Sequence, residues 1–177
     1  LSFHNLWEQE TIPVVITTRK IRTGIRTVFG LNVLIRRINK KYIFGFDYKA
    51  ETILDDMPEN RSVDEITKTF NSVGFSTPPS WLKPYSILSN GEKMRVDLAR
   101  AILENNEMFV FDEFTSVVDR HIAKIASFAM QKAIRKTEKK FIAISCHNEI
   151  EEWLLPDWIF ETNNMAFRTS EKQKKNR

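Results

Sequence analysis

The chain reads Met-Phe-Val-Phe-Asp-Glu-Phe-Thr-Ser-Val-Val-Asp over residues 108–119, and upstream it reads Leu-Ser-Asn-Gly-Glu-Lys-Met-Arg over residues 88–95. The upstream stretch is typical of a helix start, because a serine is followed three residues later by a glutamate. The downstream stretch is a short apolar run that ends in two acids and continues into a Ser-x-x-Asp turn. Few unrelated sequences place these three features in this order and so close together.

Two successive helix–strand pairs surround these stretches. Ser89 is expected to cap a helix that runs through Leu103, and the wholly apolar run Met108 to Phe111 is typical of a strand buried on both faces. A helical pattern from Val117 or Val118 to about Lys136 then leads into a second buried strand, Phe141 to Ser145. Helix followed by buried strand, twice, predicts an α/β fold with a mainly parallel sheet flanked by helices.

The first half of the chain is less regular. The β-branched run Thr11 to Thr18 indicates a strand, and Pro13 implies that it is an edge strand or that it starts there. The segments Thr27 to Ile38 and Lys41 to Phe46 are compatible with either strand or helix. A Ser-x-x-Glu capping box at Ser62 predicts another helix, and Gly74 stands where its C-terminal cap is expected.

Composition excludes several classes of protein. The 177 residues include 42% apolar residues, which is enough for a substantial core. The single cysteine, Cys146, excludes a disulfide framework within the chain, so we expect a reducing, cytoplasmic location. Apolar runs are far shorter than the roughly 20 residues that span a bilayer, so no membrane segment is expected. The chain does not begin with Met, and we expect it to be a fragment or a processed form.

Basic residues concentrate at the two ends of the chain. Positions 11–46 carry eight Lys or Arg residues and no acid, and residues 169–177 carry four against one acid. A basic, acid-free surface attracts nucleic acid by counterion release. A solvated basic face on the edge of a subdomain explains the same run without a ligand. Both readings remain open, and we expect residues 169–177 to form a disordered basic tail.

Asp112 and Glu113 are the first candidate site residues. They follow a buried strand, and open α/β sheets present ligand-binding groups at the carboxyl ends of their strands. In phosphoryl transfer one carboxylate can hold a magnesium ion while the next one orients or deprotonates the attacking water. His147 follows the strand Phe141 to Ser145, so it is expected at the same sheet edge, where it can donate to a phosphate oxygen. Strand termination and a structural histidine are the alternatives.

The start of the helix at Ser89 is suited to anions. N–H groups at Asn90, Gly91 and Glu92 are expected to face outward at the positive end of the helix dipole, and Gly91 permits close approach to the backbone. The hydroxyl of Ser89 adds a donor. An ordinary capped helix would carry the same Ser-x-x-Glu box.

Together these motifs resemble the carboxyl-terminal half of an ABC-type ATPase domain, over roughly positions 85–160. Leu88 to Glu92 resembles the signature loop of that family, with Asn90 in place of the usual Gly and Glu92 in place of the usual Gln. Met108 to Asp112 is similar to the Walker B strand, and Ser116 to Asp119 is similar to the D-loop. The resemblance implies a P-loop NTPase-like fold with a small helical signature subdomain.

The resemblance also implies roles for these residues. Asp112 would act through Mg²⁺, Glu113 would polarise water and His147 would contact the γ-phosphate of ATP. Ser89 and Gly91, with Asn90 and Glu92 beside them, would complete the site of a facing subunit, and Asp119 would couple the two sites. The implied partners are ATP and either a second copy of the chain or another ABC-type subunit.

One motif of the family has no counterpart here. An ABC-type ATPase carries a Gly-x-x-x-x-Gly-Lys-Ser/Thr loop, the Walker A motif, whose backbone N–H groups and lysine bind phosphates. The spacing from Gly24 to Gly30 is one residue too long, and Leu31 stands where the lysine belongs. Divergence, loss of the loop, or a position before Leu1 would each explain this, and we favour loss within residues 19–44.

The expected organisation is a single domain over residues 1–168. Residues 1–50 form an atypical N-terminal part, 51–105 the helical signature subdomain, and 106–168 the core from the Walker B strand to the histidine. Three functions fit: an ATPase dimer driving a conformational change in a protein or nucleic-acid partner, a degenerate subunit lending only the signature half-site, and a nucleic-acid-binding module on the same scaffold.

Overall fold

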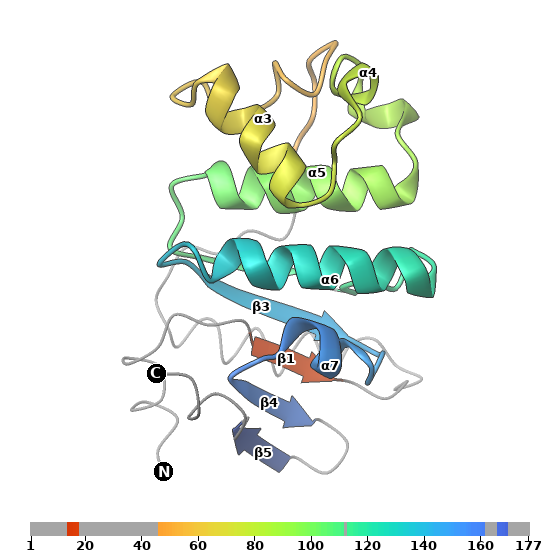
Figure 1. The fold of residues 1–177 in the computed structure, drawn as a ribbon, viewed down its shortest axis with the longest axis vertical. Helices are drawn as coiled ribbons and strands as arrows, with labels where there is room; N and C mark the ends of the chain where they lie inside the picture. The colour runs from red at the N-terminus through yellow and green to blue at the C-terminus, as the bar shows by residue number, and fades with distance from the viewer. Residues whose placement is uncertain (1–13, 18–45, 112, 162–165, 170–177) are drawn as a thin grey trace.

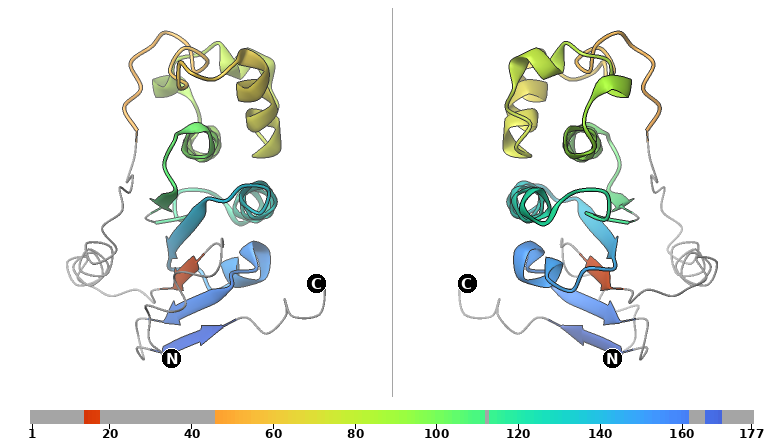
Figure 2. Two further views of the ribbon diagram at one scale, coloured as in Figure 1. Left: turned by 90° about the vertical axis from the view of Figure 1, so that its left-hand side faces the viewer. Right: turned by 90° about the vertical axis from the view of Figure 1, so that its right-hand side faces the viewer.

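The computed structural model describes residues 14–17, 46–111, 113–161 and 166–169. Within these ranges helices α3, α4 and α5 stack beyond α6, and α6 lies against a sheet (Figure 1). Figure 2 shows α6 and α7 on the same face of that sheet. The elements, in chain order, are β1 (Val14–Thr17), α3 (Val63–Ser72), α4 (Pro78–Trp81), α5 (Asn90–Leu103), β2 (Met108–Phe111), α6 (Arg120–Ile134), β3 (Lys140–Ser145), α7 (Ile150–Leu154), β4 (Trp158–Glu161) and β5 (Ala166–Thr169).

The sheet has the strand order β2-β3-β1-β4-β5. Strands β1 to β4 pair in parallel, and among the described strands only β5 is antiparallel, against β4. The expected α/β fold with a mainly parallel sheet is therefore confirmed. Strand β1 begins at Val14 and lies in the middle of the sheet between β3 and β4, so the prediction of an edge strand is wrong and a strand start next to Pro13 fits.

The two faces of the sheet belong to two apolar clusters. Phe109, Phe141 and Ala143 join the large core that the sheet shares with the helices. Val110 and Ile142, on the opposite face, join a second cluster that includes Trp158. Successive side chains of a strand point to opposite faces, so the wholly apolar runs of β2 and β3 are buried on both sides, as their sequences predict.

Helix α3 has both of the predicted ends. The Ser62 hydroxyl accepts from the backbone N–H of Glu65 while the Glu65 carboxylate accepts from the Ser62 N–H. At the other end Gly74 has φ +80°, and the Phe75 N–H donates to the Phe70 carbonyl at 2.8 Å. This is the hydrogen bond of a Schellman C-cap, which needs a left-handed residue at the glycine position.

The predicted start of α6 is wrong by a few residues. The apolar pattern suggests Val117 or Val118 as the first helical residue, but the helix begins at Arg120, because Asp119 caps it. Val117 is exposed and lies in the turn before the cap. The helix ends at Ile134, close to the expected end at Lys136.

The predictions for Thr27 to Ile38, for residues 19–44 and for most of the basic tail lie outside the described residues. Among the helices that the structure describes, none is long and apolar enough to cross a membrane.

The carboxyl end of α5 is closed by two cations from other elements. The Lys139 ammonium donates to the carbonyls of Glu104 and Asn106, the latter at 2.8 Å, and Arg61 Nε donates to the Leu103 carbonyl at 3.0 Å. The last carbonyls of a helix have no partner within the helix and carry partial negative charge, so cations stabilise this end.

Replacing Lys139 with Met is therefore expected to lower the free energy of unfolding by about 1–2 kcal/mol, because two carbonyls lose their charged donor. Urea denaturation followed by circular dichroism measures the loss. Lys136→Met is the matched control, since Lys136 is exposed and forms no ion pair within the described part of the chain, and it should change stability by less than about 0.5 kcal/mol. Equal effects of the two substitutions would contradict the capping role of Lys139.

Candidate functional site

The predicted site residues lie on one side of the molecule. Helices α5 and α6 begin on the side toward which the parallel strands β1, β3 and β4 point (Figure 1). The site therefore combines two helix N-termini with the loops that follow the strands. This is the edge at which open α/β sheets bind ligands.

The first turn of α5 is held by a capping box. The Ser89 hydroxyl accepts from the Glu92 N–H at 3.3 Å, and the Glu92 carboxylate accepts from the Ser89 N–H at 3.0 Å. The same carboxylate also accepts from the hydroxyl of Ser80, a buried residue of α4, at 2.8 Å. The backbone hydrogen bond from Ser89 holds the pKa of Glu92 below its usual range. Glu92 is thus an anchor that stays ionised and ties the α5 start to the preceding loop.

Gly91 packs against the neighbouring helix. It is buried, and a Cβ atom placed on it would lie 3.3 Å from Cγ2 of Ile122 in α6. The glycine thus allows the starts of α5 and α6 to approach each other. The prediction that the N–H groups of Asn90, Gly91 and Glu92 all face outward is wrong for Glu92, whose N–H binds the Ser89 side chain.

Asp119 organises the start of α6. Its carboxylate accepts from the backbone N–H groups of His121 and Ile122 at 2.9 and 3.0 Å. Since Ile122 also meets Gly91, the Asp119 cap and the α5 start are joined through one residue.

Glu113 lies in a tight turn that follows β2. Both Glu113 and Thr115 have positive φ, 51° and 68°, which is strained for residues that carry a Cβ. Phe114 between them is completely buried, and its N–H donates to the Ile144 carbonyl at the end of β3 at 2.7 Å. The buried Phe114 fixes the turn and leaves the Glu113 side chain exposed at the sheet edge.

His147 contacts the same turn. Its Nδ1 lies 3.3 Å from Oγ1 of Thr115, a buried residue. The Thr115 hydroxyl also donates to the Phe114 carbonyl, so it connects the imidazole ring to the backbone of the turn. The expectation that His147 emerges beside the loop after β2 is confirmed.

In the structure the predicted residues form two groups, and contacts link the residues within each group. Ser89, Gly91 and Glu92 are linked to Asp119 through Ile122, while His147 is linked to the Glu113 turn through Thr115. Asn90, the first residue of α5, is exposed. The sequence did not indicate Thr115, Ile122 or Ser80, because their roles depend on contacts between distant segments.

The described residues include only part of the predicted metal site. Among these residues no group of three or more His, Cys, Asp or Glu side chains is placed to hold a metal. Asp112, the predicted metal ligand, lies outside them, next to Glu113. Mg²⁺ commonly takes one or two protein carboxylates and fills its remaining positions with phosphate oxygens and water. Adjacent carboxylates at a strand end fit that chemistry.

Comparison with known proteins identifies the family. The family model described as ABC transporter matches residues 6–116, which is more than half of the chain. The chain belongs to this family. As an ABC transporter family member it shares 33% identity over 106 residues with "[NU+] prion formation protein 1" of Saccharomyces cerevisiae. The match covers 59% of this chain and 8% of that protein, so the chain spans less than a tenth of the length of this relative.

Solved structures share the fold of this chain. The archaeal ribosome recycling factor aABCE1, in complex with the stalk protein aP1, matches with a TM-score of 0.64 and 15% identity, over 86% of this chain and 36% of the other. The dimeric structure of MJ0796, a bacterial ABC transporter cassette, matches with a TM-score of 0.62 and 14% identity, over 86% and 82%. At these identities the likeness concerns the fold alone.

Proposed function

We propose that this chain is part of an ATP-hydrolysing ABC-type ATPase that acts as a dimer in the cytoplasm and drives a conformational change in a protein or nucleic-acid partner. The observation that carries the proposal is that His147 contacts the Glu113 turn through Thr115, on the side of the molecule where α5 and α6 begin (Figure 1). In this proposal residues 51–105 form the signature subdomain and residues 106–168 the core, within a single domain.

Each side chain has a role that its position supports. Glu113, exposed at the end of β2, orients and deprotonates the attacking water. His147, held beside the Glu113 turn by the contact of its Nδ1 with Thr115, presents its other ring nitrogen, Nε2, toward a γ-phosphate. Asp112 would hold Mg²⁺ together with phosphate oxygens, and the ion would neutralise charge on the phosphates.

The start of α5 serves the nucleotide of a facing subunit. Ser89 and Asn90 are exposed at the positive end of a fourteen-residue helix, where backbone N–H groups attract phosphate. The dimer architecture of the MJ0796 cassette supports such an arrangement for a member of the same family. Asp119, joined to the α5 start through Ile122, lies where it can link the two sites.

An equilibrium titration of the chain with ATP and Mg²⁺ tests this function. We expect saturable binding that Mg²⁺ strengthens, with release of phosphate from bound ATP. Absence of ATP binding by the chain, alone and mixed with an ABC-type partner subunit, would contradict the proposal.

A second function is favoured by one sequence observation. No Gly-x-x-x-x-Gly-Lys-Ser/Thr loop occurs in the 177 residues, and that loop provides most of the phosphate contacts in P-loop proteins. A subunit that contributes only Ser89 and Asn90 to the binding of a partner's nucleotide would need no such loop. Binding of ATP only in a mixed complex, without hydrolysis at the Glu113 site, would favour this alternative.

A steep salt dependence of DNA or RNA affinity would instead favour the nucleic-acid-binding module.

A further inference from the structure

A carboxylate in the middle of α5 joins two segments that are far apart in sequence. Asp97 accepts a hydrogen bond from the Tyr48 hydroxyl at 2.7 Å and another from the Tyr85 hydroxyl at 2.9 Å. The two tyrosine rings are stacked, with centroids 3.9 Å apart and planes within 4° of parallel. Both hydroxyls and both rings therefore fix the same pair of segments against the helix.

This cluster is half-buried and its polar groups are paired. Burial raises the pKa of the Asp97 carboxyl and the pKa of both tyrosine hydroxyls. The Arg100 guanidinium lies over the Tyr48 ring, 4.9 Å from its centroid, and donates to the Asp47 carbonyl at 2.8 Å. Hydrogen bonds to a charged group in a partly dry environment are stronger than neutral surface bonds.

The two joined segments lead to different parts of the fold. Tyr48 belongs to the segment through which the chain enters the helical part. Tyr85 begins the short 3₁₀ turn Tyr85–Ile87, which ends directly before Leu88 and the Ser89 cap. Backbone hydrogen bonds from Ile53 to Lys83 and from Leu54 to Trp81 join the same two segments farther along. Asp97 thus holds in place the turn that leads into the start of α5.

We propose that Asp97 is a positioning residue for the Ser89 half-site, acting through Tyr85, and that it links the position of this half-site to the segment around Tyr48. The inference rests on the proposed function, in which the exposed start of α5 binds the nucleotide of a facing subunit. Glu92 holds that start from the side of α4, through Ser80, and Asp97 holds it one and a half turns farther along the helix.

Hydrogen exchange and ATP titration of the chain test the proposal together. Tyr85→Phe removes one hydroxyl and keeps the ring stack, and Asp97→Asn removes the charge at nearly constant volume. In both variants we expect the amides of residues 85–91 to exchange about tenfold faster, the change that corresponds to one lost hydrogen bond to a charged group. We expect the half-saturating ATP concentration to rise severalfold in both, and more for Asp97→Asn than for Tyr85→Phe.

Two further variants separate positioning from general loss of stability. Lys139→Met weakens the opposite end of α5 and should leave exchange over residues 85–91 and the ATP affinity unchanged. Tyr48→Phe removes the other hydroxyl, and faster exchange over 85–91 in this variant is expected if the two segments are linked through Asp97.

The two kinds of failure are distinguishable. If the unmodified chain binds no ATP in any complex, the proposed function fails, while the exchange data still decide whether Asp97 fixes the 85–91 segment. If ATP binds normally and Asp97→Asn leaves either the exchange rates or the ATP affinity unchanged, the positioning role is overturned. Equal effects of Lys139→Met and Tyr85→Phe on residues 85–91 would overturn it as well.

Discussion

Glu113→Gln is expected to lower the rate of ATP hydrolysis at least about a hundredfold while ATP stays bound. General-base catalysis by a positioned carboxylate contributes roughly 10²- to 10⁴-fold, and an amide of the same shape cannot accept the proton. The turn that holds this residue is fixed by the buried Phe114 and its hydrogen bond to Ile144, so the substitution should leave the fold intact. Phosphate release measured beside an ATP titration reports both quantities.

Glu138→Gln is the matched control for this experiment. Glu138 is exposed in the loop before β3, at the opposite edge of the sheet, and the same change there should leave turnover unaltered. A Glu113→Gln variant that hydrolyses ATP at the original rate would contradict the assignment of Glu113 as the general base. A loss of both binding and turnover would point instead to a role of Glu113 in holding Mg²⁺.

Phe114→Ala is expected to have the largest effect on stability. The Phe114 ring is completely buried and lies edge-on to Phe111 and Phe141, with centroids 6.0 and 5.5 Å away. Truncating a buried phenylalanine leaves a cavity and costs about 3–5 kcal/mol. The turn that carries Glu113 and Thr115 should loosen as well, since its strained backbone is held by this anchor. Urea denaturation measures the first effect and hydrogen exchange over residues 113–116 the second.

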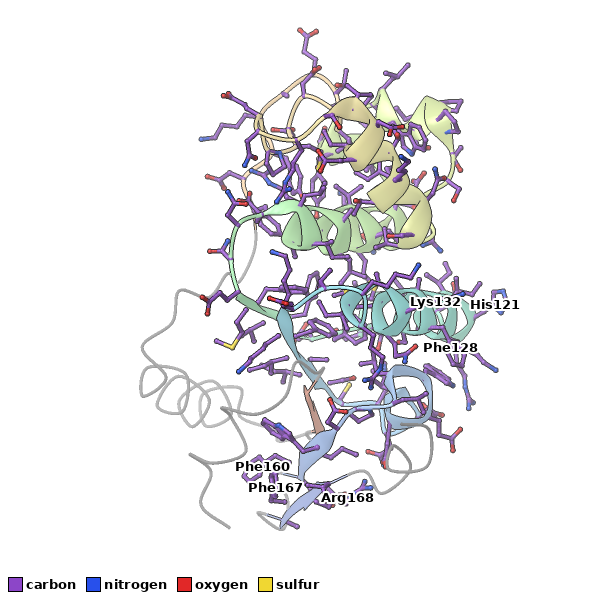
Figure 3. All side chains as sticks on the ribbon, turned by 60° about the vertical axis from the view of Figure 1, so that its left-hand side comes forward. His121, Phe128, Lys132, Phe160, Phe167 and Arg168 are labelled. Carbon is purple, nitrogen blue, oxygen red and sulfur yellow. The ribbon has the colours of Figure 1, made fainter. Side chains whose placement is uncertain are left out.

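Phe128→Ala is the matched control, because it makes the same substitution at a partly exposed position. Phe128 lies on the outer side of α6 with His121 and Lys132, where Figure 3 labels it, and 43% of its surface is exposed. Phe128→Ala should cost clearly less than Phe114→Ala, because a large part of the Phe128 ring already contacts water and its removal leaves no closed cavity. If Phe114→Ala does not fold, Phe114→Leu keeps most of the volume and should cost less than about 1.5 kcal/mol. A cost for Phe114→Ala no greater than that for Phe128→Ala would contradict the anchoring role.

Local signals in the sequence predict much of the fold. The Ser62 and Ser89 capping boxes, the Gly74 cap and the apolar strands β2 and β3 all follow from residues close together in the chain, and each is confirmed. The start of α6 is predicted less well, because two valines extend the apolar pattern into a turn that the Asp119 cap excludes from the helix.

Contacts between distant residues explain what the sequence does not predict. Gly91 suggests a place for a ligand to approach, but Ile122, thirty-one positions later, occupies that side of the glycine. Thr115 becomes significant only through His147, and Asp97 only through Tyr48, which is forty-nine positions away. No local pattern encodes such pairs, because they depend on how the elements pack.

The place of β1 in the sheet has a consequence for how the chain folds. This strand is synthesised first among the described elements, yet its neighbours β3 and β4 begin at Lys140 and Trp158. Helices α3 and α5 make local contacts and can assemble while the rest of the chain is still emerging from the ribosome. The middle of the sheet closes only after β3 and β4 have been synthesised, so its pairing should follow the assembly of the helices and be slow.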